Sequence, residues 1–204
     1  MRYIDLKKLE ATPLETQPYD HVIVPGFVGG LHAAALDQEF PSINQPGSFP
    51  LTSVGARGAL AELAEELNSA AFRGAIERKF RIDLGQAATM FTARGWCRHE
   101  DGKVHTDSKS KIITVLLYLN PEPWLPFGGR LRLLDAENIE AVAAEVKPDF
   151  GTLLVFRRSD RSWHGHLPYE GPRRILQMNW VTSDGVAAWE QFRHAVSARV
   201  KHLT

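Results

Sequence analysis

A histidine and an aspartate stand two residues apart in the segment GKVHTDSKSK, as His105 and Asp107. On a strand, side chains at positions i and i+2 project from one face, so both groups can reach the same metal ion. A second pair with this spacing, His164 and His166, lies in the segment RSWHGHL. Two imidazoles and one carboxylate can bind one side of an Fe(II) ion and leave positions open for a cosubstrate and oxygen. Zinc accepts the same ligand types.

The elements that must position these residues change in character along the chain. From residue 86 onward, short β-branched or aromatic runs recur between turn signals, which indicates strands. We predict strands at 87–94, 103–107, 112–120, 129–135, 151–158, 162–167 and 173–182. The acidic segment 135–149 is expected to be a solvated face with at most a short helix. Short, regularly separated strands favour a jelly roll or a small barrel.

The first 85 residues and the last 22 show helical spacing instead. We expect a short strand at 20–28, a helix at 31–40, a surface loop at 39–52, and a helical region at 57–80 that breaks near Asn68. The fold class predicted is therefore α+β, with a β core braced by N-terminal helices and a C-terminal helix. We predict a single domain over 1–204, divided into helical support (1–85), a catalytic core (86–182) and a C-terminal helix (183–204).

Composition excludes little about partners but constrains the cellular setting. Lys plus Arg and Asp plus Glu number 24 each, so no net charge points to nucleic acid or to an anionic membrane. A single cysteine, Cys97, rules out an intrachain disulfide, and the N-terminus lacks the apolar segment of a secretory signal. We expect a cytoplasmic protein without membrane spans. The sequence does not indicate an oligomeric state.

The order of these motifs resembles the 2-oxoglutarate/Fe(II)-dependent dioxygenases, in particular their prolyl-4-hydroxylase-like branch. The chain has an H-x-D motif, the strand ending YLN, a distant histidine followed four residues later by Pro168, and an arginine ten residues after that histidine. The resemblance covers residues 87–182 and implies a double-stranded β-helix. It assigns His105, Asp107 and His164 as the catalytic Fe(II) ligands. It also implies 2-oxoglutarate and O2 as cosubstrates, with release of succinate and CO2.

The same resemblance assigns an arginine on the last strand to the distal carboxylate of 2-oxoglutarate. A guanidinium can hold a carboxylate with two parallel hydrogen bonds and stays charged. Both Arg173 and Arg174 are candidates, and strand alternation favours Arg174, whose face includes Leu176 and other apolar residues expected to line the barrel interior. The resemblance also makes Tyr118 of the YLN strand a second group for that carboxylate. His166 is left beside the site, without an iron-binding role.

The substrate is not determined by these motifs. The resemblance suggests a peptidyl proline, but small molecules are also substrates among relatives of this size. Ahead of His105, Trp96, Arg98 and His99 stand where related enzymes carry tyrosines, and residues 108–111 form an unassigned rim. Two other functions use the same three ligands: a non-catalytic cupin-like module that binds a metal or a sugar, and a zinc hydrolase.

Overall fold

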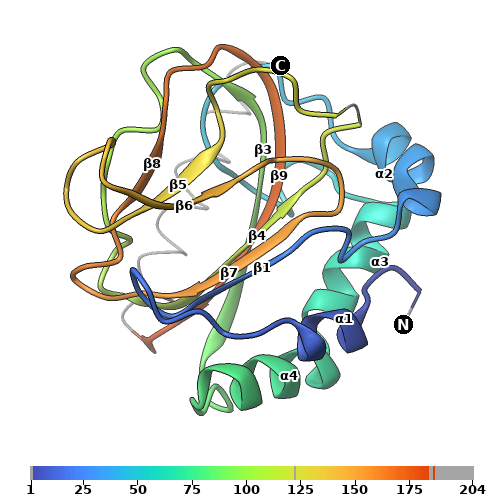
Figure 1. Ribbon diagram of the computed structural model, residues 1–204. Coiled ribbons are helices and arrows are strands. Elements are labelled where there is room, and N and C mark those ends of the chain that lie inside the picture. Colours follow the sequence, from blue (N-terminus) through green and yellow to red (C-terminus); the bar gives the residue numbers. More distant parts are fainter. Residues whose placement is uncertain (1, 122, 184–185, 187–204) are drawn as a thin grey trace.

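The computed structural model of the protein describes residues 2–121, 123–183 and 186, and most of its regular structure is antiparallel β-sheet (Figure 1). The helical elements of the first 80 residues are α1 (Leu6–Ala11), η1 (Gly30–His32), α2 (Ala33–Glu39), α3 (Gly58–Leu67) and α4 (Ala70–Phe80). The strands are β1 (His21–Val24), β2 (Phe49–Pro50), β3 (Ala88–Cys97), β4 (Lys111–Tyr118), β5 (Leu131–Leu134), β6 (Val142–Val146), β7 (Leu153–Arg157), β8 (His164–His166) and β9 (Gly171–Val181).

The strands form two sheets, which we call the large and the small sheet. The large sheet has the order β1-β7-β4-β9-β3-β2, and the small sheet has the order β6-β5-β8. Large-sheet residues such as Tyr118, Phe156 and Ile175 share one buried cluster with Leu131 and Leu133 of the small sheet. The two sheets therefore pack face to face, as in a jelly roll.

The helices lie on the opposite side of the large sheet from the small sheet (Figure 1). Their apolar residues form one continuous buried cluster with Val115, Leu176, Met178 and Trp180 of the large sheet. The Phe72 ring on α4 stacks on Trp180, with 6.0 Å between the centroids. Both faces of the large sheet are thus covered, one by helices and one by strands.

Local sequence explains where the helical region 57–80 divides. The apolar residues Leu60, Leu63 and Leu67 are spaced three and four apart and are fully buried on one face of α3. The hydroxyl of Ser69 then accepts a hydrogen bond from the backbone N–H of Phe72 at 3.2 Å, which caps the start of α4. The predicted break near Asn68 is therefore present.

Two predictions about the remaining segments need correction, and a third concerns residues that the structure mostly does not describe. The segment 135–149 is mostly exposed, as predicted, but it contains strand β6, which pairs antiparallel with β5, so the expectation of at most a short helix is wrong. Strand β6 is an edge strand whose side chains are mostly exposed, so its sequence lacks the apolar alternation of a half-buried strand. Segment 103–107 contributes only a bridge between His105 and His164. The predicted helix at 183–204 lies almost entirely outside the described residues.

None of the helices in the described part of the chain has the length and apolar character needed to cross a membrane.

Candidate metal centre

Three side chains from two distant segments meet at one end of the space between the sheets. The nitrogen and oxygen atoms that His105, Asp107 and His164 offer as ligands all lie within 4.8 Å of one another. A two-way backbone bridge holds them together, because the His105 N–H donates to the His164 carbonyl and the His164 N–H donates to the His105 carbonyl, each at 3.0 Å. The three residues predicted as one ligand set are thus brought together.

Backbone acceptors fix the orientation of both imidazoles. Nδ1 of His105 lies 2.8 Å from the Lys103 carbonyl oxygen, and Nδ1 of His164 lies 2.9 Å from the Ser162 carbonyl oxygen. Because a carbonyl only accepts, each Nδ1 carries the proton and each Nε2 keeps a lone pair. Burial lowers the pKa of His164 to about 4, so this imidazole is neutral at neutral pH. Neutral imidazoles with a free Nε2 are what a metal ion requires.

The carboxylate of Asp107 is held by two neighbours. Its Oδ1 accepts a hydrogen bond from Lys111 Nζ at 2.7 Å, and its Oδ2 accepts one from the Thr114 hydroxyl at 2.5 Å. Burial alone would raise the pKa of Asp107, but the charge of Lys111, the neighbouring His164 and these hydrogen bonds together lower it. The group is therefore ionised and correctly charged for a metal ion.

The three ligand residues line a cavity of about 210 Å³, which we call the metal cavity. Its apolar wall comes from both sheets: Leu116, Leu131, Phe156 and Ile175. The polar residues that the large sheet adds to the lining include Arg94, Arg173 and Gln177. A small, partly apolar hollow with a few converging polar groups is the usual form of a small-molecule site.

Arg173 is buried in this cavity beside Tyr118. Its Nε donates to the Gly129 carbonyl oxygen at 2.8 Å, and its Cζ lies 5.4 Å from the centroid of the Tyr118 ring. Among the described residues, neither Nη2 of Arg173 nor the buried hydroxyl of Tyr118 has a hydrogen-bond partner. Leaving two buried polar atoms unpaired is costly unless a ligand satisfies them. A guanidinium and a hydroxyl side by side suit a carboxylate.

Arg174 lies on the other face of β9, so the preference for Arg174 over Arg173 as the residue inside the barrel is wrong. Its guanidinium forms an ion pair with Asp37 of α2 and lies 5.3 Å from the ring centroid of Phe40. The alternation used for the prediction holds, because Arg174 does share its face with Leu176. That apolar face packs against the helices, however, and the more polar face borders the metal cavity.

Residues 86–182 match the family model described as the 2OG-Fe(II) oxygenase superfamily. The segment contains the three clustered ligands and the arginine in the metal cavity. Residues 86–182 belong to the 2OG-Fe(II) oxygenase superfamily. This superfamily uses Fe(II), 2-oxoglutarate and O2, for which the His-Asp-His group and the unpaired groups of Arg173 and Tyr118 are suitable.

Solved structures of prolyl hydroxylases share the fold of this protein. A prolyl-4-hydroxylase from Pseudomonas putida is 20% identical, with 87% of this chain and 91% of that chain covered and a TM-score of 0.58. A prolyl 4-hydroxylase from Phytophthora capsici is 18% identical, with coverages of 97% and 76% and a TM-score of 0.62. The viral collagen prolyl hydroxylase of Paramecium Bursaria Chlorella virus-1, in its 2OG complex, is 14% identical, with coverages of 79% and 94% and a TM-score of 0.55. No curated protein sequence matches the chain.

The buried side chain of Asn120, just past the end of β4, joins three segments of the chain. Its Nδ2 donates to the Pro148 carbonyl oxygen at 2.7 Å, and its Oδ1 accepts from the backbone N–H of Arg174 at 2.7 Å. A neighbouring backbone bond runs from the Leu119 N–H to the Arg174 carbonyl at 3.1 Å. The start of β9 is thus tied to the end of β4 by both side-chain and backbone bonds.

His166 borders the metal cavity but is not part of the three-residue group that could hold the ion. Its Nδ1 lies 2.8 Å from the Leu167 carbonyl oxygen, and its Nε2 lies 3.8 Å from Sγ of Cys97. Burial, together with the charge of Arg173, lowers the pKa of His166 to about 4. His166 is therefore a neutral wall residue, as its expected position beside the site implied.

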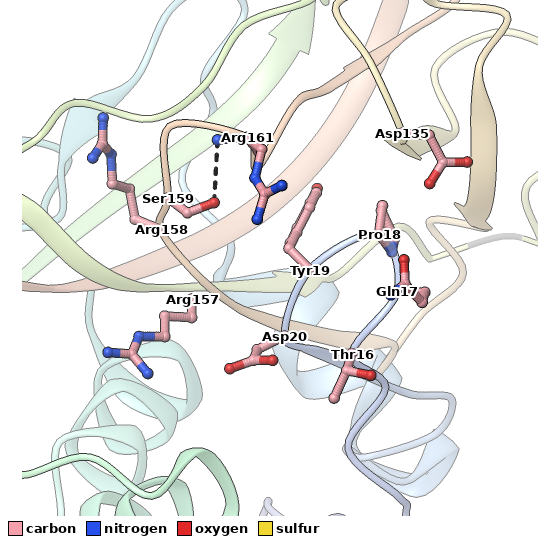
Figure 2. Close-up of a pocket in the computed structure, with 10 residues that line it drawn as sticks. All are labelled: Thr16, Gln17, Pro18, Tyr19, Asp20, Asp135, Arg157, Arg158, Ser159 and Arg161. Carbon is pink, nitrogen blue, oxygen red and sulfur yellow. Dashed lines mark hydrogen bonds between the residues drawn. The ribbon is translucent and has the colours of Figure 1, made fainter.

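A second cavity, of about 450 Å³, lies next to the candidate metal centre and is shown in Figure 2. It touches the centre through Arg158, whose Nε donates to the Asp107 carbonyl at 3.1 Å, and through Tyr19, whose hydroxyl donates to the Trp163 carbonyl at 3.1 Å. Three arginines and two aspartates line it. Because both signs of charge are present, this cavity has no strong preference for an anion or a cation.

Proposed function

We propose that the protein is an Fe(II)- and 2-oxoglutarate-dependent dioxygenase that hydroxylates a C–H bond and releases succinate and CO2. The observation that carries this proposal is the pair of unpartnered buried groups, Arg173 Nη2 and the Tyr118 hydroxyl, next to a His-Asp-His cluster. A metal site alone would serve several reactions. A metal site beside a buried receptor for a second carboxylate favours a dicarboxylate cosubstrate.

In this proposal, His105 and His164 bind Fe(II) through Nε2 and Asp107 binds it through its carboxylate. The carbonyls of Lys103 and Ser162 keep the two rings in the required tautomer. Lys111 and Thr114 keep Asp107 ionised and fix its rotation. Two histidines and one carboxylate leave coordination positions open for other ligands.

The distal carboxylate of 2-oxoglutarate is held by Arg173, with Tyr118 as a second donor. The bond from Arg173 Nε to the Gly129 carbonyl fixes the plane of the guanidinium, so Nη2 is oriented before the cosubstrate arrives. Pre-oriented donors gain affinity because little side-chain freedom remains to be lost. Arg174, paired with Asp37 on the other face, has no part in this binding.

When bound, Fe(II) with 2-oxoglutarate and O2 supplies the oxidising power that inserts an oxygen atom into a C–H bond. The residues of the chain contribute position and exclusion of water. The apolar side chains of Leu116, Phe156 and Ile175 border the cavity between the ligands and Arg173. Such a wall limits water near the reacting atoms and strengthens the electrostatic contacts around them.

We also propose that the whole chain, 1–204, is one folding unit, with 86–182 as its catalytic core and 1–85 as its support. In support, the buried residues of α1, α3 and α4 belong to the same cluster as Leu117, Leu176 and Trp180 of the core strands. Removal of the helices would expose this face of the large sheet to water, at a large loss of stability.

The substrate class in this proposal is a peptidyl proline or a small molecule. The similar structures are prolyl hydroxylases, one of them a collagen prolyl hydroxylase, which supports a proline in a peptide. The size of the metal cavity supports either an amino-acid side chain or a compound of that size.

The test is an anaerobic titration of the purified protein with Fe(II) and then 2-oxoglutarate, followed by addition of air. We expect a weak visible charge-transfer band when 2-oxoglutarate joins the iron, and slow succinate formation once O2 is present. A cupin-like module would bind the metal without a band or succinate. A zinc hydrolase would show neither and would be active with Zn(II). Either result would contradict the proposal.

A further inference from the structure

The metal cavity carries more positive charge than the proposed reaction needs. Three cationic side chains line it, Arg94, Lys111 and Arg173, against the single carboxylate of Asp107 in that lining. Lys111 is paired with Asp107, and Arg173 has the proposed role of holding 2-oxoglutarate. Fe(II) and dianionic 2-oxoglutarate cancel in formal charge. The cavity therefore keeps a surplus of positive charge after both are bound, and Arg94 is the cation that has no assigned partner.

Strand pairing directs Arg94 into the cavity. Arg94 lies on β3 directly opposite Ile175 of β9, and residues opposite each other in an antiparallel pair project from the same face. Ile175 lines the metal cavity, as does Arg173 two residues earlier on the same face. A β-bulge follows between Arg94 and Trp96, so the regular pairing ends at this point. Bulges commonly re-aim a side chain beside an active site.

Arg94 is an exposed residue that lines the metal cavity. In the described part of the chain, its side chain makes no hydrogen bond and no ion pair, in contrast to Arg98, four residues later, which binds Asp101 at the surface. Two guanidiniums in one small cavity repel each other unless anions separate them.

We propose that Arg94 binds a carboxylate of the primary substrate, so that the enzyme hydroxylates a compound with a carboxylate close to the reacting C–H bond. This inference rests on the proposed function and narrows its substrate class. The planar fork of an arginine is suited to a carboxylate and provides orientation as well as affinity. A substrate whose carboxylate is bound by Arg94 has a fixed orientation toward the iron on the other side of the cavity. The same carbon atom would then react in every turnover.

The test uses propionate, a small carboxylate, and propionamide, the uncharged amide of similar size, as its control. The protein is loaded with Zn(II) in place of Fe(II), which prevents turnover, and saturated with 2-oxoglutarate. The arginine side chains are labelled with ¹⁵N, and the Arg94 Nε signal is assigned by its loss in Arg94→Gln. We expect propionate to shift this signal and propionamide to leave it in place. From the backbone amide signals of the cavity strands, the dissociation constant of propionate should rise about tenfold or more in Arg94→Gln.

Arg98→Gln is the matched control, because Arg98 lies just past the end of the same strand but is bound to Asp101 outside the metal cavity. It should bind propionate like the wild type. The proposal is overturned if propionate leaves the Arg94 signal unchanged, or if propionamide shifts it equally. It is also overturned if Arg94→Gln weakens 2-oxoglutarate as strongly as propionate, because Arg94 would then belong to the cosubstrate site. Absence of succinate formation by the Fe(II) wild type would instead contradict the proposed function.

Discussion

The two faces of the large sheet are both covered by protein, yet they carry different kinds of side chains. Toward the helices, strands β4 and β9 present an almost unbroken apolar surface that includes Val115, Leu117 and Met178. Toward the small sheet, the same strands present Thr114, Asn179 and the other polar groups of the metal cavity. The first face stabilises the fold, whereas the second can keep polar groups buried only if they bind one another or a ligand. The difference identifies the side of the sheet that borders the metal cavity.

The largest effect is expected at a metal ligand. Asp107→Ala removes the carboxylate and leaves Lys111 without its partner, so metal binding and succinate formation should fall by roughly a thousandfold or more. Metal content and succinate release measure the effect. Asp160→Ala, which removes an exposed partner of Arg158, is the matched control and should behave like the wild type. Unchanged turnover in Asp107→Ala would contradict the assignment of the catalytic face.

On the helix face the largest effect should be on stability. Trp180 is fully buried against Phe72, and Trp180→Ala should lower the free energy of unfolding by about 3–5 kcal/mol. Gln177→Ala, on the cavity face of the same strand, should change it by about 1 kcal/mol or less. Urea denaturation compares the two variants. Equal losses would show that the two faces do not differ in this way.

Adjacent arginines on β9 allow a direct test of the two faces. Arg173→Ala should raise the dissociation constant of 2-oxoglutarate about tenfold to a hundredfold, because a charged hydrogen-bonded pair is lost. Arg174→Ala removes a surface ion pair with Asp37 and should change this constant by about threefold or less. Calorimetric titration of the metal-loaded protein measures both. The reverse order of effects would make Arg174 the anchor.

A smaller effect is expected at Thr114, which hydrogen-bonds to the proposed metal ligand Asp107. The Thr114 hydroxyl lies 2.5 Å from Asp107 Oδ2, and Thr114→Val replaces it with a methyl group of similar size. Metal affinity should fall by roughly tenfold, the lower end for partners of metal ligands. Thr114→Ser keeps the hydroxyl and should retain most of the affinity. If Val and Ser behave alike at this position, the hydrogen bond has no influence on the metal.

Much of the metal centre could be predicted from sequence because its signals are local. The spacing of His105 and Asp107, and the histidine ahead of Pro168, depend on residue type and order alone. Alternation also correctly groups Tyr118 with Thr114 and Leu116. When both faces of a sheet are covered by protein, both carry buried residues. Alternation along a strand then does not show which face contains the site. This is why Arg173 could not be chosen over Arg174.

Other features depend on contacts between distant segments. Strand β6 is recognised only by its pairing with β5, because the exposed side chains of an edge strand lack an apolar pattern. The position of Arg94 depends on its pairing with Ile175 and on the bulge that follows. A charged residue at the end of an apolar strand such as ATMFTAR is a weak signal by itself.

Asn120 supports the strand alignment that places Arg173, and not Arg174, in the metal cavity. A slip of β9 by one residue along β4 would turn every side chain to the opposite face, exchanging Arg173 for Arg174. The amide of Asn120 accepts the Arg174 N–H only in the observed alignment, and at the same time it holds the Pro148 carbonyl. Asn120 thus helps to fix the register of β9 against β4. Building the side chains of the metal cavity into another sheet would therefore require such a contact as well as the side chains themselves.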